Sequence, residues 1–529
     1  MTRRVSVVLS AVFAAGVVGA CARSVPASGG RGGPGDPGGA AIARAASSIT
    51  AASSRQHLAV LADDSMRGRA SLRPEIWWSA RYIAAQFRAF GLEPLDADGD
   101  YIEEFPIHVP QVELSGVVMR VEADGRLLEL RCGDDFAVSP AWELPRLGPL
   151  VLGRQRDHVW YREHAAEIPD AALVLMPFAP IDSMPDNLRL GSSIEAMVEA
   201  GAEGTGVVLP AGSPPDWIRS SARALMQQPL NRFFPPWILL SYETLVRIFD
   251  FAGRHAPDLA TLGDSLLQLP VVISFDIPMT TRVVRVPTVL ARLPGSAPHG
   301  TLKDVVITAH FDHDPPDSPS AAADSVYNGS DDNASGTVAL IEAARALALL
   351  PEPPARSVVF VAVAGEELGL LGSDHLAEAG PATARTTAIN LNLDMVSRGP
   401  SDSLYVFGQT YSSLGSLFRR VLDAHPELSL HVRPGVQLPD YDLISMSDQF
   451  SYLRRGVPVL FFHSGLHPEL HTPADEVSLA DNDKLARTAR LVVYVAHASA
   501  SDVAEPVWTV DGRARVQLLQ RRRMRRARR

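Results

Sequence analysis

Histidine and acidic residues stand at six places in the second half of the chain, and their types suit metal-assisted hydrolysis. In chain order they are His310 with Asp312, Asp331 with Asp332, Glu366 with Glu367, Asp394, Asp448 and His471. Zinc binds histidine nitrogen and carboxylate oxygen, and a catalytic zinc keeps one position for water or substrate. Five protein ligands can serve two ions if one carboxylate bridges them. The set therefore predicts a hydrolytic site for two zinc ions.

Each of these motifs alone has an ordinary structural explanation. Acidic residues ahead of a helix, such as Asp331 and Asp332, are usually helix caps. Glu366 and Glu367 could compensate a helix dipole from its first turn. The charge of Asp394 at the end of an apolar strand is costly unless it is coordinated or paired. The prediction of a metal site therefore depends on the joint occurrence of the motifs after successive strands.

Strands and helices alternate around these residues. Apolar strands are predicted near residues 304–309, 357–364, 388–395 and 457–463, and helices near 335–349, 367–379, 411–424, 446–455 and 481–497. This alternation predicts an α/β three-layer sandwich with a mostly parallel central sheet. Ligands of open α/β sheets bind beyond the carboxyl ends of the strands, which is where His310 and Asp394 are expected.

Glu366 and Glu367 are neighbours whose side chains diverge, so they can have different roles. One can bind metal while the other takes a proton from the attacking water and passes it to the leaving amine. Asp312, two positions after His310, is placed to hold the second nitrogen of that imidazole. Four further histidines are expected to be ordinary surface or structural residues: His313, His375, His463 and His467.

The motifs together resemble the zinc aminopeptidase and glutamate carboxypeptidase-like family of co-catalytic dizinc metallopeptidases. The resemblance covers roughly residues 50–115 and 285–500. It runs through His-Phe-Asp at 310, Asp-Asp-Asn-Ala-Ser-Gly at 331, Glu-Glu at 366, Asn-Leu-Asp-Met at 392, Ser-Asp at 447 and His-Thr-Pro-Ala-Asp at 471. It implies a phosphorylase/hydrolase-like α/β fold and two zinc ions per chain, for which cobalt or manganese could substitute.

The resemblance also implies which residues bind the metal. Asp332 bridges the two ions. His310 and Asp394 complete the coordination of one ion, and Glu367 and His471 complete that of the other. The peptide bond after Asp332 is expected to be cis although no proline follows it.

The general base follows from the same resemblance, whereas the role of Asp312 follows from its position beside His310. Glu366 is the general base, and Asp312 is assigned to the catalytic residues as the partner of the metal-binding imidazole. An aminopeptidase also needs a recess for the free N-terminus of its substrate. Asp312 and Asp448 are candidates for shaping that recess.

The bulk composition is that of a folded protein with more than one domain. The chain has 529 residues, of which 46% are hydrophobic and 21% charged, and its formal net charge is −11. This length suggests two or three folded units. No nucleic-acid partner is expected, because the arginine-rich end within residues 504–529 has the composition of a solvated, disordered tail.

The N-terminal region has the pattern of an export signal. Arg3 and Arg4 precede an apolar run that ends at Ala20, and Val18-Gly19-Ala20-Cys21 resembles a bacterial lipoprotein processing site. Residues 1–21 are therefore predicted to be a signal peptide with a lipidated Cys21, which would place the protein in the cell envelope. The alternative is ordinary cleavage near Ala20 and secretion. Residues 22–45 are expected to be a flexible linker because they are rich in Gly, Pro and Ser.

The remaining boundaries follow from changes in pattern. Residues 46–120 are expected to be the N-terminal part of a peptidase domain and residues 285–503 its catalytic part. Residues 121–284 lack a catalytic constellation and loosely resemble a β-rich protease-associated domain, with an unclassified β-rich insertion as the alternative. Cys132 is expected to be a packed thiol.

The sequence therefore favours an exported dizinc metallo-exopeptidase, and among these an aminopeptidase that acts on peptides through metal-activated water. Carboxypeptidase or dipeptidase action on the same site is the nearest alternative. Glutaminyl-peptide cyclisation with one zinc ion and a metal-free binding scaffold are the others. The retention of all five ligand candidates and Glu366 argues against the scaffold.

Overall fold

The computed structural model describes residues 37–527, apart from 96–98, 142–145, 154–157, 179–183, 232–235, 264–265, 314–325 and 435–442. The predicted signal peptide and Cys21 lie outside these residues. The described residues divide into two compact units. One contains residues 106–284, and the other contains residues 37–105, 285–434 and 443–527. All the predicted site residues belong to the second of these units.

The second unit is built on a mixed sheet, which has nine strands among the described residues. The strand order is β1-β12-β14-β13-β15-β18-β16-β17, and β2 pairs with β12. The strands are β1 (Glu93–Pro94), β2 (Ile102–Val112), β12 (Met279–Leu293), β13 (Asp304–His310), β14 (Val358–Val363), β15 (Thr387–Leu393), β16 (Ser403–Phe407), β17 (His431–Pro434) and β18 (Val459–His463). Because the neighbours β14, β13, β15 and β18 run parallel, their carboxyl ends meet at one edge.

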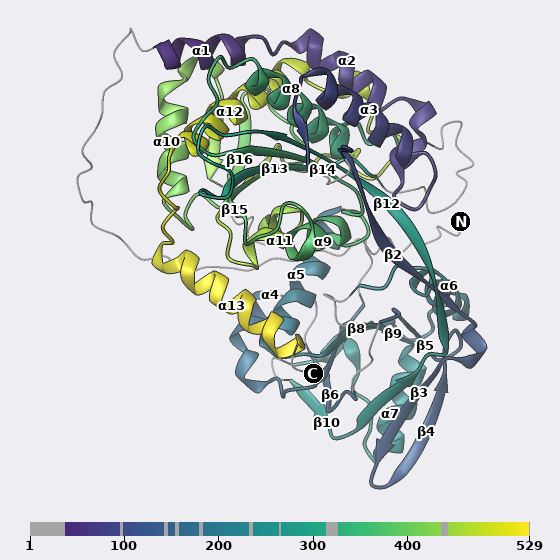
Figure 1. Ribbon diagram of the computed structural model, residues 1–529. Helices are drawn as coiled ribbons and strands as arrows, with labels where there is room; N and C mark the ends of the chain where they lie inside the picture. The colour runs from purple at the N-terminus through teal and green to yellow at the C-terminus, as the bar shows by residue number, and fades with distance from the viewer. Residues whose placement is uncertain are drawn as a thin grey trace. The chain divides into compact units, whose positions relative to one another are not determined.

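Helices cover both faces of this sheet. The central strands are apolar runs whose residues are almost all buried, as expected for a parallel sheet enclosed on both sides. Helices α8 (Gly336–Ala348) and α12 (Asn482–Ser501) lie on one face, and α9 (Leu371–Ala379) and α11 (Gln449–Leu453) lie on the other (Figure 1). Helix α10 (Leu414–Ala424) packs against α12. The predicted α/β sandwich is confirmed.

Three helices at the start of the described chain pack on the same unit. They are α1 (Pro37–Ser47), α2 (Ala51–Leu61) and α3 (Ile76–Ala89), and each contacts α8 or α12. The expectation of a flexible linker through residue 45 is therefore wrong from residue 37 onward. Alanine is the best helix former, and Ile42, Ala45 and Ala46 bury an apolar stripe that the Gly and Pro content concealed.

The unit of residues 106–284 contains helices as well as strands. Its strands are β3 (Val118–Ala123), β4 (Arg126–Arg131), β5 (Phe136–Val138), β6 (Leu150–Leu152), β7 (Leu173–Pro177), β8 (Gly204–Val208), β9 (Trp237–Leu240), β10 (Leu267–Leu269) and β11 (Val272–Asp276). Its helices are α4 (His158–Glu163), α5 (Met184–Ala200), α6 (Pro215–Leu225) and α7 (Tyr242–Phe251).

The observed helices and strands differ from the β-rich insertion that was predicted for residues 121–284. The strands β6, β7, β8 and β9 are parallel, and parallel neighbours require crossover connections, which helices supply here. The unit begins at residue 106 rather than 121. Its kinship with protease-associated domains stays a prediction. Cys132 is buried in its core, and burial raises the pKa of the thiol to about 11, which fits a packed thiol.

The C-terminal segment is helical rather than a disordered tail. Helix α13 spans Val510–Ala527. Val516 and Leu519 are buried at a spacing of three residues, so the arginine-rich sequence carries an apolar stripe that anchors its first turns. Among the described residues, none of the helices combines the length and apolar character that a membrane span requires.

Candidate metal centre

The predicted site residues gather at the carboxyl edge of the four parallel strands. Because these strands are hydrogen-bonded neighbours, the residues that follow their ends are brought together although they are far apart in sequence. They are His310 at the end of β13, Glu366 and Glu367 after β14, Asp394 after β15, and His471 in the loop after β18.

The first group of candidate ligands consists of His310, Glu366 and Asp394, whose ligand atoms lie within 4.8 Å of one another. His310 Nε2 is 3.3 Å from Asp394 Oδ1 and 4.0 Å from Glu366 Oε2. His310 is 1% exposed, so its imidazole is removed from bulk water.

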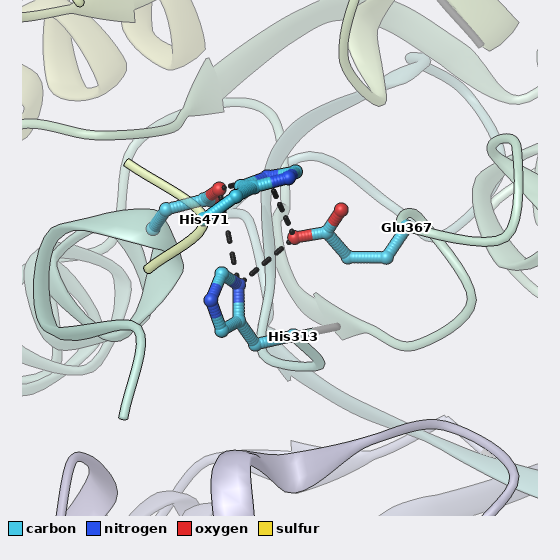
Figure 2. A group of neighbouring side chains, drawn as sticks. His313, Glu367 and His471 are labelled. Carbon is cyan, nitrogen blue, oxygen red and sulfur yellow. Dashed lines mark hydrogen bonds and ion pairs between the residues drawn. The ribbon is translucent and has the colours of Figure 1, made fainter. Parts of the chain in front are cut away.

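The second group consists of His313, Asp332, Glu367 and His471, and its ligand atoms also lie within 4.8 Å of one another. His471 Nε2 is 2.9 Å from Asp332 Oδ2 and 3.6 Å from Glu367 Oε1. His313 Nδ1 is 3.0 Å from the same Glu367 oxygen. Figure 2 shows both imidazoles directed at that carboxylate from different sides.

Asp332 connects the two groups through its two carboxylate oxygens. Its Oδ1 is 3.5 Å from His310 Nε2 in the first group, whereas its Oδ2 faces His471 in the second. The residue lies in the turn Ser330–Ser335 that leads into α8. The peptide bond between Asp332 and Asn333 is cis, as predicted. A carboxylate in this position can bind two metal ions at once.

Asp312 links His310 to the loop that carries Glu366. His310 Nδ1 is 3.2 Å from the Asp312 carbonyl oxygen and 3.7 Å from its carboxylate Oδ1, so the nearer partner is the backbone. The Asp312 carboxylate accepts hydrogen bonds from the Ser71 hydroxyl and the Gly365 N–H, both at 2.8 Å. The Glu366 N–H donates a longer one, at 3.4 Å. Asp312 therefore positions both the imidazole and the Glu366 backbone.

Comparison with known protein families finds a match for the residues that build this edge of the sheet. The model of peptidase family M28 matches residues 288–496, which include every residue of the two groups. Residues 288–496 form a family M28 peptidase domain. The predicted metallopeptidase class is therefore confirmed for this part of the chain.

The M28 domain is similar in sequence to fungal and bacterial aminopeptidases. Leucine aminopeptidase 1 of Trichophyton rubrum is 30% identical over 222 residues, which is 39% of this chain and 56% of that protein. Aminopeptidase YwaD of Bacillus subtilis is 28% identical over 218 residues, which is 38% of this chain and 42% of that protein. The matches thus span about half the length of these relatives. An aminopeptidase structure from Aneurinibacillus aligns at a TM-score of 0.48 and 17% identity, covering 88% of this chain and 97% of that one.

The pKa values of the carboxyl groups in the M28 site show how these groups would respond to bound cations. The pKa of Glu367 is raised to about 8, chiefly by burial and also by the nearby Asp332. Burial likewise raises the pKa of Glu366, and Glu367 and Asp448 add to the effect against the opposing His310. Burial opposes ionisation of Asp332, yet the imidazoles of His471 and His310 hold its pKa below the ordinary value. Bound cations would favour the ionised carboxylates.

Asp448 is buried near the M28 site but belongs to neither ligand group. Burial raises the pKa of its carboxyl to about 7. The next residue, Gln449, accepts a hydrogen bond from the Asn392 amide and donates one to the Ile444 carbonyl. The role predicted for Asp448, which is to shape a recess for the substrate N-terminus, stays a prediction.

His313 is the site residue that sequence reasoning missed. It was expected to be an ordinary histidine, because a loop residue has no periodicity that reveals its direction. The available signal was its position three residues after His310, beyond the same strand. The other three histidines stand apart from both groups: His375 stacks on Phe105, His463 accepts from the Gly465 N–H, and His467 contacts Asp331 and Glu469.

Proposed function

We propose that this protein is a dizinc aminopeptidase that removes N-terminal residues from peptides. The position of Asp332 carries the proposal, because each of its carboxylate oxygens faces a different ligand group. The predicted ligands are two histidines and three carboxylates, and zinc binds both kinds of side chain. Cobalt or manganese could replace zinc in such a site.

The five predicted ligands would hold the ions: His310, Asp332, Glu367, Asp394 and His471. Two bound zinc ions would lower the pKa of a coordinated water molecule and polarise the scissile carbonyl. The protein must then provide a group that moves protons.

Glu366 is suited to that role. Its carboxylate lies 4.0 Å from His310, at the edge of the first group, and its side chain is 10% exposed. Burial raises the pKa of its carboxyl above the ordinary value, which makes the carboxylate a better proton acceptor. Glu366 takes the proton of the attacking water and then delivers it to the leaving amine. Asp312 supports this geometry by accepting from the Glu366 N–H.

Aminopeptidase action is favoured over the alternatives by specific observations. The relatives similar to the M28 domain are named aminopeptidases, and several are named leucine aminopeptidases, so leucine is the first residue to test. Two complete ligand groups fit two ions better than the single ion of a glutaminyl cyclase. The presence of every ligand candidate opposes a metal-free scaffold.

The test combines metal content with substrate preference. Purified protein should contain about two zinc ions per chain and hydrolyse leucyl-anilide in a chelator-sensitive manner. Glu366→Gln should keep both ions and lose hydrolysis. Parallel assays use amino-blocked peptides and peptides with N-terminal glutamine. Cleavage of blocked peptides alone would indicate a carboxypeptidase, and cyclisation with one ion would indicate a cyclase.

We also propose that the protein is exported and anchored through Cys21. The charged and apolar pattern before this residue supports the proposal. Cells that express the full chain should incorporate labelled palmitate into it, and Cys21→Ala should abolish the label. A soluble extracellular product with no label in the parent chain would instead indicate ordinary secretion.

A further inference from the structure

We propose that His313 is a direct metal ligand, so that four protein side chains surround the second ion. The proposal rests on the dizinc function above and extends it to a residue outside the five predicted ligands. It gives the two ions unequal coordination. The ion beside His313 has a filled coordination shell, and the ion beside His310 has a free coordination position.

The distances around His313 fit coordination. Ligand atoms around a tetrahedral zinc ion, each about 2.0–2.1 Å from it, lie about 3.3 Å apart. His313 Nδ1 is 3.0 Å from Glu367 Oε1 and 3.8 Å from Asp332 Oδ2. These are the two oxygens that also face His471, at 3.6 and 2.9 Å. Both imidazoles therefore face one shared point.

The two imidazoles approach that point from different directions. Their ring centroids are 5.4 Å apart and their planes are 83° to each other. Figure 2 shows the two rings converging on Glu367 rather than stacking. Since all four ligand atoms of the second group lie within 4.8 Å of one another, a single ion can contact all of them.

The fold holds the His313 ring in this orientation. A Cβ at Gly329 would lie 2.6 Å from His313 Cγ, so the ring fits only against a glycine. Buried Arg69 donates to the carbonyls of Phe311 and Gly329, at 2.8 and 2.9 Å, and so fixes the backbone on both sides of the ring. His313 is 1% exposed. The imidazole is thus positioned before any ion binds.

Unequal coordination has a functional consequence. The second ion would have His313, His471, Glu367 and a share of Asp332, which fills a tetrahedral shell. The first would have His310, Asp394 and the other oxygen of Asp332, which leaves a position for water or substrate. We infer that substrate binds at the first ion, and that the second is retained more tightly.

A hydrogen bond from His313 to Glu367 is the competing explanation, and two substitutions separate it from coordination. His313→Asn keeps an N–H donor near the place of Nδ1 but is a poor zinc ligand, whereas His313→Asp supplies a ligand oxygen and no donor. His375→Gln is the control, because that histidine belongs to neither group. Zinc is titrated with a competing chelator, and each protein is checked by circular dichroism.

Coordination predicts that His313→Asn weakens binding of one ion by roughly 100-fold or more, since loss of even an outer partner costs about 10–100-fold. His313→Asp should keep two ions, and so should the control. Unchanged binding in His313→Asn together with weakened binding in His313→Asp would overturn the inference.

X-ray absorption of the zinc-loaded protein without substitutions (the parent protein) measures the number of imidazole ligands per zinc ion independently. Three histidines shared by two ions predict an average of roughly 1.5 imidazoles per zinc, whereas the five predicted ligands alone give roughly one. An average near one, with two ions bound, would overturn the assignment of His313 and leave the proposed function standing. Fewer than two ions in the parent protein would overturn both.

Discussion

Asp475 accepts a hydrogen bond from the backbone N–H of Asp332, with its Oδ2 at 3.1 Å from that nitrogen. The same carboxylate accepts from the N–H of Asp331, and both of its oxygens are within 3.1 Å of that nitrogen. The loop that carries Asp475 follows His471 directly. One carboxylate outside the ligand groups therefore fixes the backbone of the residue shared by both ions.

Replacing Asp475 should weaken metal binding without removing a ligand. Asp475→Ala leaves two buried N–H groups without their acceptor, so Asp332 loses its fixed orientation. Zinc affinity is expected to fall about 10–100-fold, as for other partners of metal ligands. Competition titration with a chelator measures this. Asp483→Ala, an exposed acid in the first turn of α12, is the control. Equal affinity in the two variants would contradict the role of Asp475.

Replacing Glu366 should separate chemistry from metal binding. Glu366→Gln removes the proton acceptor but preserves the size of the side chain, and kcat is expected to fall about 10²–10⁴-fold. Zinc content should stay at about two ions per chain because Glu366 is not among the assigned ligands. Loss of an ion in parallel with activity would instead make Glu366 a ligand, and elemental analysis beside the kinetic assay decides this.

Arg69 should be a major determinant of stability. Its guanidinium is fully buried and donates to four carbonyls, those of Leu61, Phe311, Asn328 and Gly329. Arg69→Met leaves these acceptors unsatisfied and should lower the free energy of unfolding by about 3–5 kcal/mol. Chemical denaturation measures the change.

The neighbouring exposed arginine provides a matched control for this prediction. Arg67 lies two residues before Arg69, and its side chain is exposed. Arg67→Met should change the free energy of unfolding by less than about 0.5 kcal/mol. Similar losses in both variants would show that charge, rather than the buried hydrogen bonds, is responsible.

The metal-free protein should lose stability as the pH rises. Burial raises the pKa of Glu367 to about 8 and that of Asp448 to about 7, whereas unfolded carboxyl groups ionise near pH 4. Above that pH the unfolded chain binds fewer protons than the folded one, so the free energy of unfolding falls until the folded groups ionise. Thermal unfolding of chelated protein should therefore show Tm decreasing between about pH 5 and 8.

Zinc should reverse this trend, because protons compete with metal for the ligand carboxylate of Glu367. The difference in Tm between zinc-loaded and chelated protein is expected to grow over the same interval of pH. A Tm of the chelated protein that rises between pH 5 and 8 would contradict the raised pKa values of Glu367 and Asp448.

The central sheet was predictable because its strands are short apolar runs with polar residues at their carboxyl ends. The predicted strand at 388–395 corresponds to β15, and the helix at 335–349 corresponds to α8. The sequence did not reveal α13, whose buried Val516 and Leu519 stand within a run of arginines. In that segment the local composition concealed an apolar stripe.

The candidate site was predictable where its residues lie at strand ends, but not where they lie within loops. Residues at the end of a strand or directly after it, such as His310 and Asp394, have a location that the sheet dictates. The direction of a loop side chain such as His313 depends instead on distant partners, here Gly329 and Arg69. No spacing rule in the sequence contains that information.

The acceptors of Arg69 also set a limit on the order of events during synthesis. The carbonyl of Phe311 that it contacts belongs to a residue 242 positions later in the chain. At about 5–20 residues per second, the ribosome needs roughly 10–50 s to reach that residue after it has passed Arg69. Throughout this interval the guanidinium has only the nearby Leu61 carbonyl as a native partner. The metal centre therefore cannot assemble until the whole unit of residues 106–284, and the segment with the remaining acceptors, has been synthesised.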